Sequence, residues 1–409
     1  MAIISAFRAL RPSKELAPCV ASLPYDVLNS AEARVLAEKN PYSFLHITKA
    51  EIDLPEGTDI HSDKVYHKAA DNLFIFQDNK ILVQDEKPAY YIYELTMGGK
   101  KQTGLVCVSS VTDYENNIIK KHELTRPEKE LDRINHMRIT GAQTGNVFLA
   151  YKSSVTLSDL INSWKEANEA ANDFIADDGV SHRVWVVHEP HIIHEITKIF
   201  EKQIPYTYIA DGHHRAASAA KVKNAMGKDA TPEAGYFLTT LFPHDELRIM
   251  DYNRVVKDLN GLDANTFIKK LSKNFRVEKI NDAYSPDLLH NFGMYLEGSW
   301  YRLEANKDSF PNDPIGILDV SILQENILSP LLGIQDPRTD NRIDFVGGIR
   351  GLKELEKRVD SGQMKLAFSL YPVSMEQLFN IADSGQIMPP KSTWFEPKLR
   401  DGLLTHLIR

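Results

Sequence analysis

A polar stretch of five residues, set between an apolar run and an alanine-rich run, most constrains how this chain can fold. Residues 206–210 are aromatic, β-branched or small, which predicts a short buried strand. Four of residues 216–221 are alanine, the residue with the highest helix propensity. Only Asp211-Gly212-His213-His214-Arg215 lies between them, so the chain must turn tightly there. A strand, a tight turn and a helix in succession indicate a mixed α/β fold.

The residues of this turn also have the chemistry of an anion site. A helix that begins here presents unpaired backbone N–H groups and the positive end of its dipole. Gly212 allows close approach of the backbone, the guanidinium of Arg215 matches phosphate oxygens, and His213 and His214 can add donors. Asp211 then remains available to help hold a metal ion. The alternative is a polar turn that only caps the helix, and two histidines with an arginine favour function over that alternative.

Further elements follow from similar patterns. Two β-rich runs, 89–95 and 102–108, flank Gly98-Gly99 and predict a β-hairpin. Strands are expected at residues 147–151, 183–187 and 236–242, and helices at residues 31–39 (with Ser30 as N-cap), 127–137, 157–176, 192–202, 264–274 and 375–383. Soft boundaries near residues 88 and 227–232 divide the chain into an N-terminal segment (1–88), a phosphate-binding core (89–230) and a C-terminal substrate-side domain (231–409).

Composition narrows the class of protein. The formal charge of −8 argues against a broad nucleic-acid surface, which needs a clustered basic face. No stretch approaches the roughly 20 apolar residues of a membrane helix, and the first residues lack a signal peptide pattern, so a cytoplasmic protein is expected. Cys19 and Cys107 lack CxxC partners, which fits a reducing compartment. The expected partners are therefore small molecules, without nucleic acid or membrane, and the sequence does not indicate an oligomeric state.

A second motif precedes the helix predicted near residue 127. Glu123 follows His122, and a carboxylate at this place is a candidate general base for an attacking hydroxyl. Thr125 and Glu128 are better explained as a cap and a capping box of that helix. The motif is not a zinc protease motif, because Arg126 stands where HExxH requires its second histidine.

A third motif lies near the end of the sequence, where Lys391, Ser392 and Thr393 follow two prolines. The prolines favour an extended backbone, and the three side chains offer donors to a carboxylate or phosphate. A proline-rich terminal loop without a ligand is the alternative. The spacing of His188, His191 and His194 is compatible with a metal pair, but histidines at a helix start are common on protein surfaces. Walker, GxGxxG and GxSxG motifs are absent.

In this order, the three motifs resemble those of the free L-serine kinases of the ParB/sulfiredoxin superfamily. The resemblance rests on His122-Glu123, on Ala210 to Arg215 and on Pro389 to Thr393, and the gap from Glu123 to Asp211 is several dozen residues longer than in those kinases. Nearly the whole chain, including residues 23–27 and 390–393, also resembles the DUF1015 family. The resemblance implies a ParB/sulfiredoxin-like nucleotide-binding core with added N-terminal and C-terminal segments.

The same resemblance implies roles for residues. It makes Glu123 the base that deprotonates the serine hydroxyl, and it assigns Asp211 to catalysis and to Mg²⁺. Gly212, His213, His214 and Arg215 would hold the phosphates of ATP or ADP, and His122, Lys391, Ser392 and Thr393 would lie near L-serine. Tyr25 and Asp26 are further candidates to reach the site. The expected product is O-phospho-L-serine.

The sequence also bears on functions other than a kinase. A DNA-partition protein is disfavoured, because no helix-turn-helix is evident and the chain is acidic. A sulfiredoxin-like reductase is excluded, because histidines occupy the place of its cysteine. A nucleotide-binding regulator without kinase activity remains the main alternative.

Overall fold

The computed structural model describes all 409 residues and confirms a mixed α/β fold. The helices are α1 (Ala17–Val20), α2 (Ser30–Ala37), α3 (Leu45–Thr48), α4 (Asp63–Asp78), α5 (Val111–Glu115), α6 (Pro127–Thr140), α7 (Val155–Ala167), α8 (Pro190–Gln203), α9 (His213–Met226), α10 (Ala264–Leu271), α11 (Asp319–Leu323), α12 (Leu352–Asp360) and α13 (Met375–Asp383). The strands of the first 250 residues are β1 (Ile4–Ser5), β2 (Leu10–Pro12), β3 (Leu82–Gln84), β4 (Tyr90–Met97), β5 (Lys100–Ser110), β6 (Ile119–Lys120), β7 (Ala142–Gln143), β8 (Val147–Tyr151), β9 (Asn172–Ile175), β10 (Ser181–Val187), β11 (Thr207–Asp211), β12 (Tyr236–Pro243) and β13 (Ile249–Met250). The remaining strands are β14 (Tyr252–Val256), β15 (Phe275–Ile280), β16 (Asn291–Leu296), β17 (Ser299–Ala305), β18 (Ile343–Gly347), β19 (Leu366–Leu370), β20 (Trp394–Phe395) and β21 (His406–Leu407).

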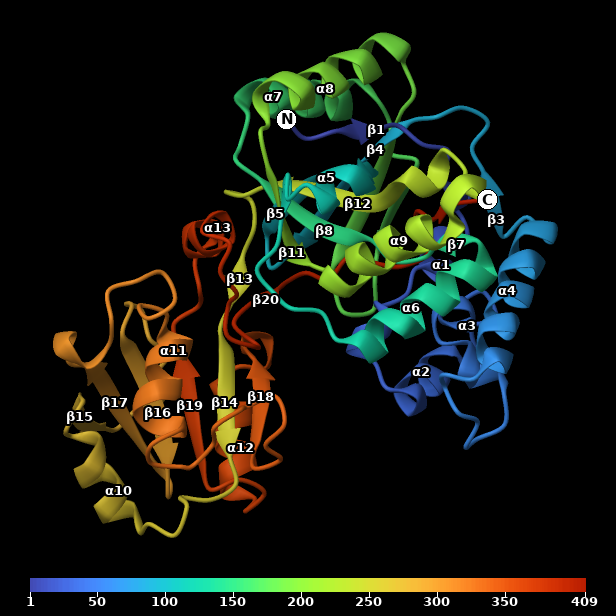
Figure 1. Cartoon of the computed structure of the whole chain (residues 1–409). Helices are drawn as coiled ribbons and strands as arrows, with labels where there is room; N and C mark the ends of the chain where they lie inside the picture. The colour runs from blue at the N-terminus through green and yellow to red at the C-terminus, as the bar shows by residue number, and fades with distance from the viewer. The chain divides into compact units, whose positions relative to one another are not determined.

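The chain forms two compact units (Figure 1). The first contains residues 1–247 together with 397–409, and the second contains residues 248–396. This division differs from the three consecutive segments expected from the sequence. Residues 1–88 join the first unit because β1 pairs with β5, and residues 231–247 join it because β12 pairs with both β5 and β8.

A nine-stranded mixed sheet organises the first unit. Its order is β6-β11-β8-β12-β5-β4-β10-β9, with β1 pairing to β5 off this path. The predicted hairpin is confirmed as antiparallel β4 and β5, and Gly98 and Gly99 take the positive φ angles that its turn requires. Strand β11, which precedes the polar turn, lies between β6 and β8. The turn therefore starts from an interior strand of the sheet.

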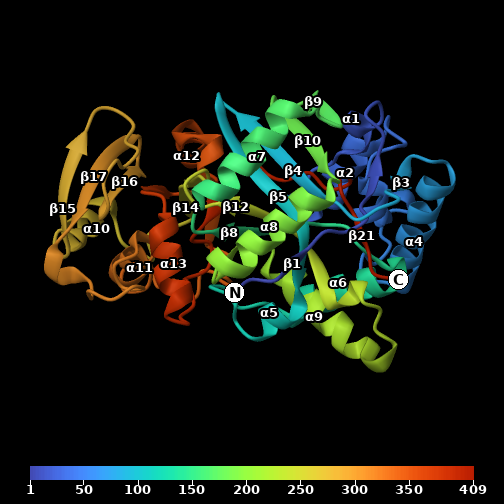
Figure 2. The same cartoon turned by 90° about the horizontal axis from the view of Figure 1, so that it is seen from above.

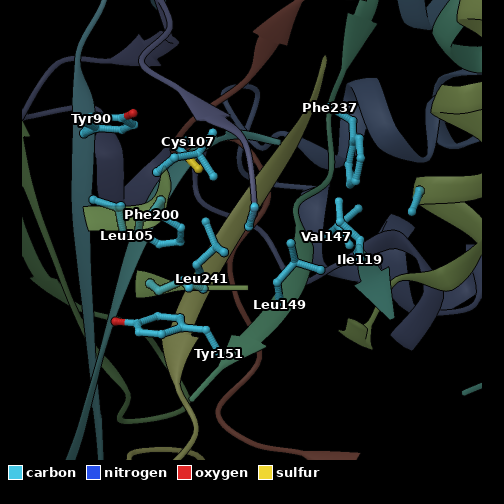
Figure 3. Close-up of a cluster of buried hydrophobic side chains, with 14 of the residues drawn as sticks. Tyr90, Leu105, Cys107, Ile119, Val147, Leu149, Tyr151, Phe200, Phe237 and Leu241 are labelled. Carbon is cyan, nitrogen blue, oxygen red and sulfur yellow. The ribbon is translucent and has the colours of Figure 1, made fainter. Parts of the chain in front are cut away.

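Side chains that alternate along the strands build the main core. On β5 these are Leu105 and Cys107, and on β8 they are Val147, Leu149 and Tyr151, all buried (Figure 3). A strand turns alternate side chains to opposite faces, so these residues share one face of the sheet. Apolar residues of α7, α8 and α9 pack in the same cluster. Burial on α9 extends over seven of its first eight residues, which fixes the start of that helix against the sheet.

The C-terminal residues return to the first unit and complete it (Figure 2). Strand β21 pairs with β7, Thr405 exchanges backbone hydrogen bonds with Leu10, and Asp401 does so with Ser22. The second unit is thus inserted in the sequence between β12 and this final segment. None of the helices combines the length and apolar character of a membrane span.

The second unit has a six-stranded antiparallel sheet in the order β15-β17-β16-β19-β14-β18. Val255, Tyr295 and Ala367 on one face of this sheet pack with Leu355 and Val359 of α12. The shorter strands β13 and β20 pair with each other.

Most predicted elements are present, but three details of the local predictions are wrong. The N-cap of α2 is Asn29, which forms a capping box with Glu32, and not Ser30. The N-cap of α6 is Arg126, without a side-chain cap, so Thr125 does not fill that role and Glu128 has no capping box. The helix predicted over residues 157–176 ends at Ala167, and β9 follows it.

Candidate functional site

The polar turn between β11 and α9 has the geometry expected of an anion site. Gly212 is the N-cap of α9, with φ of 96°, and no side chain caps the helix. A Cβ at Gly212 would lie 3.3 Å from the Cα of Val147, so this position requires glycine on both conformational and steric grounds. The first turn of α9 therefore offers backbone N–H groups and the positive end of a helix dipole.

Arg215, in the first turn of α9, is held by groups far away in the sequence. Its Nη1 donates to the backbone oxygen of Asn146 at 2.6 Å, and its Nη2 donates to Oδ2 of Asp26 at 3.0 Å. Only 10% of the side chain is exposed, and the buried Nε has no hydrogen-bond partner. Burial lowers the pKa of Arg215, but the carboxyl groups of Asp26 and Asp401 outweigh it and keep the guanidinium charged. A fixed cation with an unused donor thus stands at the start of α9.

Tyr25 and Asp26 lie in a short 3₁₀ turn, Tyr25–Val27, that reaches this arginine. The guanidinium carbon of Arg133 lies 3.9 Å from the centroid of the Tyr25 ring, and that of Arg215 lies 5.2 Å from it. Burial raises the pKa of the Tyr25 hydroxyl, so the ring carries no charge of its own at neutral pH. The ring of Tyr25 lies within cation–π distance of both guanidinium groups and stabilises both of them.

Asp211, the last residue of β11, is paired with a lysine from the C-terminal segment. Its Oδ2 lies 3.0 Å from Nζ of Lys398, and 43% of the aspartate side chain remains exposed. Partial burial raises the pKa of Asp211, but Lys398 and Arg215 hold it well below the ordinary value. Asp211 is therefore an anion throughout the physiological pH range and is accessible from solvent.

The two histidines connect α9 to the segment that carries Glu123. Nε2 of His213 accepts a hydrogen bond from the backbone N–H of His122 at 3.4 Å, and Nε2 of His214 accepts one from Arg126 at 2.9 Å. Burial lowers the pKa of both histidines, and that of His213 falls well below its usual range. Because Nε2 of neutral His213 accepts this hydrogen bond, the ring proton must be on Nδ1. Nδ1 lies 3.6 Å from Oε2 of Glu123.

The structure thus brings Glu123 close to the first residue of the polar turn's helix, and the roles expected of these residues stay predictions. The glutamate side chain is 54% exposed, whereas His213 beside it is buried. His122 is buried as well, its ring meets that of His213 edge to face at 4.5 Å, and its Nδ1 has no hydrogen-bond partner. Burial lowers the pKa of His122 to about 4. A carboxylate, neutral imidazoles and an uncapped helix start are therefore combined at one place.

Comparison with known proteins gives the family. The model of the family described as "Protein of unknown function (DUF1015)" matches residues 4–321. The chain belongs to this family. No curated protein matches the sequence.

This DUF1015 member is also similar to several solved structures, of which three are described. The chain is similar to a conserved hypothetical protein from Pyrococcus furiosus, with 14% identity, a TM-score of 0.36, and coverage of 74% of this chain and 94% of that one. It is also similar to a free serine kinase in complex with AMP, with 12% identity, a TM-score of 0.36, and coverage of 74% and 91%. For SbnI with C-terminal truncation from Staphylococcus aureus, identity is 10%, the TM-score is 0.40 and coverage is 74% and 87%.

The third predicted motif of this DUF1015 member belongs to the second unit. Lys391 is exposed and has φ of 58°, which is uncommon outside glycine. The hydroxyl of Ser392 donates to the backbone oxygen of Pro389 at 2.6 Å, so it holds the loop, and Thr393 is half-buried. The substrate-binding role of these three residues stays a prediction.

Sequence reasoning missed several groups of the site. Lys398, which pairs with Asp211, and Asp401, whose carboxyl group interacts electrostatically with Arg215, lie about 190 residues beyond the turn, and no local pattern marks them. Asn146 acts through a backbone oxygen, which its side chain does not reveal. No group of three or more histidine, cysteine, aspartate and glutamate residues is arranged to hold a metal ion. His188, His191 and His194 are therefore not arranged as a metal site of this kind.

Proposed function

We propose that this protein is a kinase that transfers a phosphoryl group from ATP or ADP to the hydroxyl of free L-serine. The observation that carries the proposal is the position of Glu123, whose carboxylate lies 3.6 Å from His213, the first residue of the uncapped helix α9. A base placed beside an anion site is the minimal arrangement for attack of an alcohol on a bound phosphate. The resemblance of the motifs to free L-serine kinases supplies serine as the acceptor.

In this proposal the nucleotide phosphates bind at the start of α9. The backbone N–H groups of its first turn and the guanidinium of Arg215 stabilise the negative charge of the phosphates. Asp26 and Asn146 hold that guanidinium at both ends, so it needs little rearrangement when charge develops. Gly212 provides the positive φ angle from which α9 starts, at a place where the Cα of Val147 leaves little room for a side chain.

Glu123 acts as the base. The serine hydroxyl gives its proton to the Glu123 carboxylate, and the serine oxygen forms a bond to the terminal phosphorus. The bond from that phosphorus to the bridging oxygen of the nucleotide breaks, which releases ADP from ATP or AMP from ADP. Nδ1 of neutral His213 orients the glutamate without neutralising it, since an uncharged imidazole competes less for the carboxylate than a cation would.

Asp211 fits a role in binding Mg²⁺. Magnesium in such sites is usually held by one or two carboxylates, substrate phosphates and water, so one ionised and accessible aspartate is sufficient. When bound, the ion would offset the charge of the phosphates. Lys398 keeps Asp211 ionised and adds a second positive charge on the same side of the turn.

Phosphorus NMR on the purified protein with Mg²⁺, L-serine and either ATP or ADP tests the proposal. We expect a new phosphomonoester resonance that depends on L-serine, and the nucleotide that produces it identifies the donor. L-Alanine is the matched control, because it lacks only the hydroxyl. Nucleotide binding without this signal would contradict serine kinase activity. It would leave another hydroxylated acceptor, or a nucleotide-binding regulator.

A further inference from the structure

The second unit contains a buried arginine on an interior strand of its sheet. Arg254 lies at the middle of β14, between β18 and β19, opposite Phe345 on one side and Phe368 on the other. Only 4% of Arg254 is exposed. Arginine is almost never buried to this extent without a partner of opposite charge.

Arg254 has no such partner. Its guanidinium donates to the backbone oxygens of Tyr252 and Lys391, the latter at 2.9 Å, and it lies 5.3 Å from the ring centroid of Phe345. No carboxylate forms an ion pair with it, and burial lowers its pKa to about 10. The carbonyl oxygens and the ring orient the guanidinium and offset part of its desolvation. They do not neutralise its charge.

A second cation stands at the same place. Nζ of Lys391 lies 5.6 Å from the centroid of the Tyr252 ring, and the guanidinium carbon of Arg254 lies 5.9 Å from that centroid. The backbone of Lys391, with its positive φ, also accepts the hydrogen bond from Arg254. Two positive charges are therefore held around one tyrosine, and neither has an acidic partner.

Aromatic rings close one side of this pair of cations. Trp394 packs edge to face on Tyr252 with a centroid distance of 5.1 Å. A Cβ on Gly347 would lie 2.9 Å from the indole of Trp394, so glycine is needed for the indole to lie there. Apolar rings beside a charge lower the local dielectric, which strengthens the attraction of the two cations for any anion that binds.

We propose that Arg254 and Lys391 form a second anion site, which binds a small oxyanion: a carboxylate or a phosphate group. The planar guanidinium matches the spacing of oxygen atoms in both groups, and the exposed ammonium of Lys391 provides the entry. An oxyanion supplies the missing negative charge of the cluster. This site consists of residues of the second unit only and does not depend on the kinase proposal.

Titration of the full-length protein, followed by the fluorescence of Trp394, tests this site. Inorganic phosphate and acetate are added in separate experiments at constant ionic strength, and Trp394→Phe identifies the part of the signal that comes from this indole. We expect a saturable change in emission. Saturation by phosphate alone supports a phosphate ligand, saturation by acetate alone supports a carboxylate, and saturation by both supports a general oxyanion site.

Variants decide whether the two cations are responsible. Arg254→Met is expected to abolish the response, and Lys391→Ala to weaken the affinity about tenfold, because it removes one of two nearby charges. Arg276→Met is the matched control, since Arg276 is an exposed arginine on β15 of the same unit. If Arg254→Met does not fold, the affinity of Lys391→Ala for the oxyanion decides the question, because Lys391 is exposed and its substitution leaves the core intact. A wild-type protein that does not saturate, or equal affinities of Lys391→Ala and Arg276→Met, would overturn the proposal.

Discussion

Substitution of Glu123 by glutamine separates catalysis from stability at the candidate site. Glu123 is more than half exposed, and its neighbour His213 is uncharged at neutral pH, so their contact is not an ion pair. Since more than half of the Glu123 side chain is exposed to water, removal of its charge is expected to change the free energy of unfolding by less than about 1 kcal/mol. A general base contributes about 10²- to 10⁴-fold to a rate, which corresponds to about 3–5 kcal/mol of activation free energy.

The assay is the initial rate of O-phosphoserine formation, followed by phosphorus NMR, together with urea unfolding of the same samples. We expect Glu123→Gln to lose at least a hundredfold in kcat with an unchanged unfolding midpoint. Glu128→Gln, an exposed glutamate in the first turn of α6, is the matched control and is expected to retain the wild-type rate. A Glu123→Gln protein with full activity would refute the assignment of the base. A protein that loses activity and stability together would indicate a structural role.

Three further predictions concern the surroundings of Arg215. Arg215→Lys is expected to weaken nucleotide binding by about 10- to 100-fold in calorimetry, because one ammonium cannot replace donors that reach both Asn146 and Asp26. Lys398→Met is expected to raise the pKa of Asp211 in a carboxyl NMR titration, since it removes the cation that lowers this pKa most. Burial raises the pKa of Asp401 to about 7, so the folded protein retains a proton there that the unfolded chain loses near pH 4. This group therefore makes stability fall between about pH 4 and 7, and Asp401→Asn is expected to reduce that fall in unfolding titrations.

Helices and strands whose signal lies in their own residues were predictable from the sequence. The hairpin of β4 and β5 follows from two β-rich runs around Gly98-Gly99, and α9 follows from its alanine content. Strand β8 and helix α13 have the bounds that their patterns predict. In each case the signal lies within a few residues of the element that it describes.

Errors arose where two local signals competed. Asn29 and Ser30 are both good N-caps, and only the glutamate three residues after Asn29 decides between them. At α6, Pro127 fits the first helical turn and restricts Arg126 to an extended conformation, which makes Arg126 the N-cap without any contribution from its side chain. The start of α6 is thus determined by the backbone of Pro127 and not by a capping side chain.

The candidate site was predictable in part. The turn from Asp211 to Arg215 and the residues His122 and Glu123 each carry a local signature, and the structure brings them together through His213 and His214. Lys398 and Asp401 could not be predicted as site residues, because their positions depend on how the C-terminal segment pairs with strands and loops far away in the sequence. Contacts over such separations follow from the fold and not from sequence spacing.

The return of the final segment to the first unit has a consequence for the synthesis of the protein. Residues 1–247 leave the ribosome first, but the lysine that pairs with Asp211 and the buried aspartate near Arg215 are made only after the whole second unit. Until then, the cations of the turn lack Asp401 and Asp211 lacks Lys398. A growing chain therefore has the start of α9 long before it has a complete site. Translation that stops before residue 397 would yield a protein with most of its core and an incomplete site.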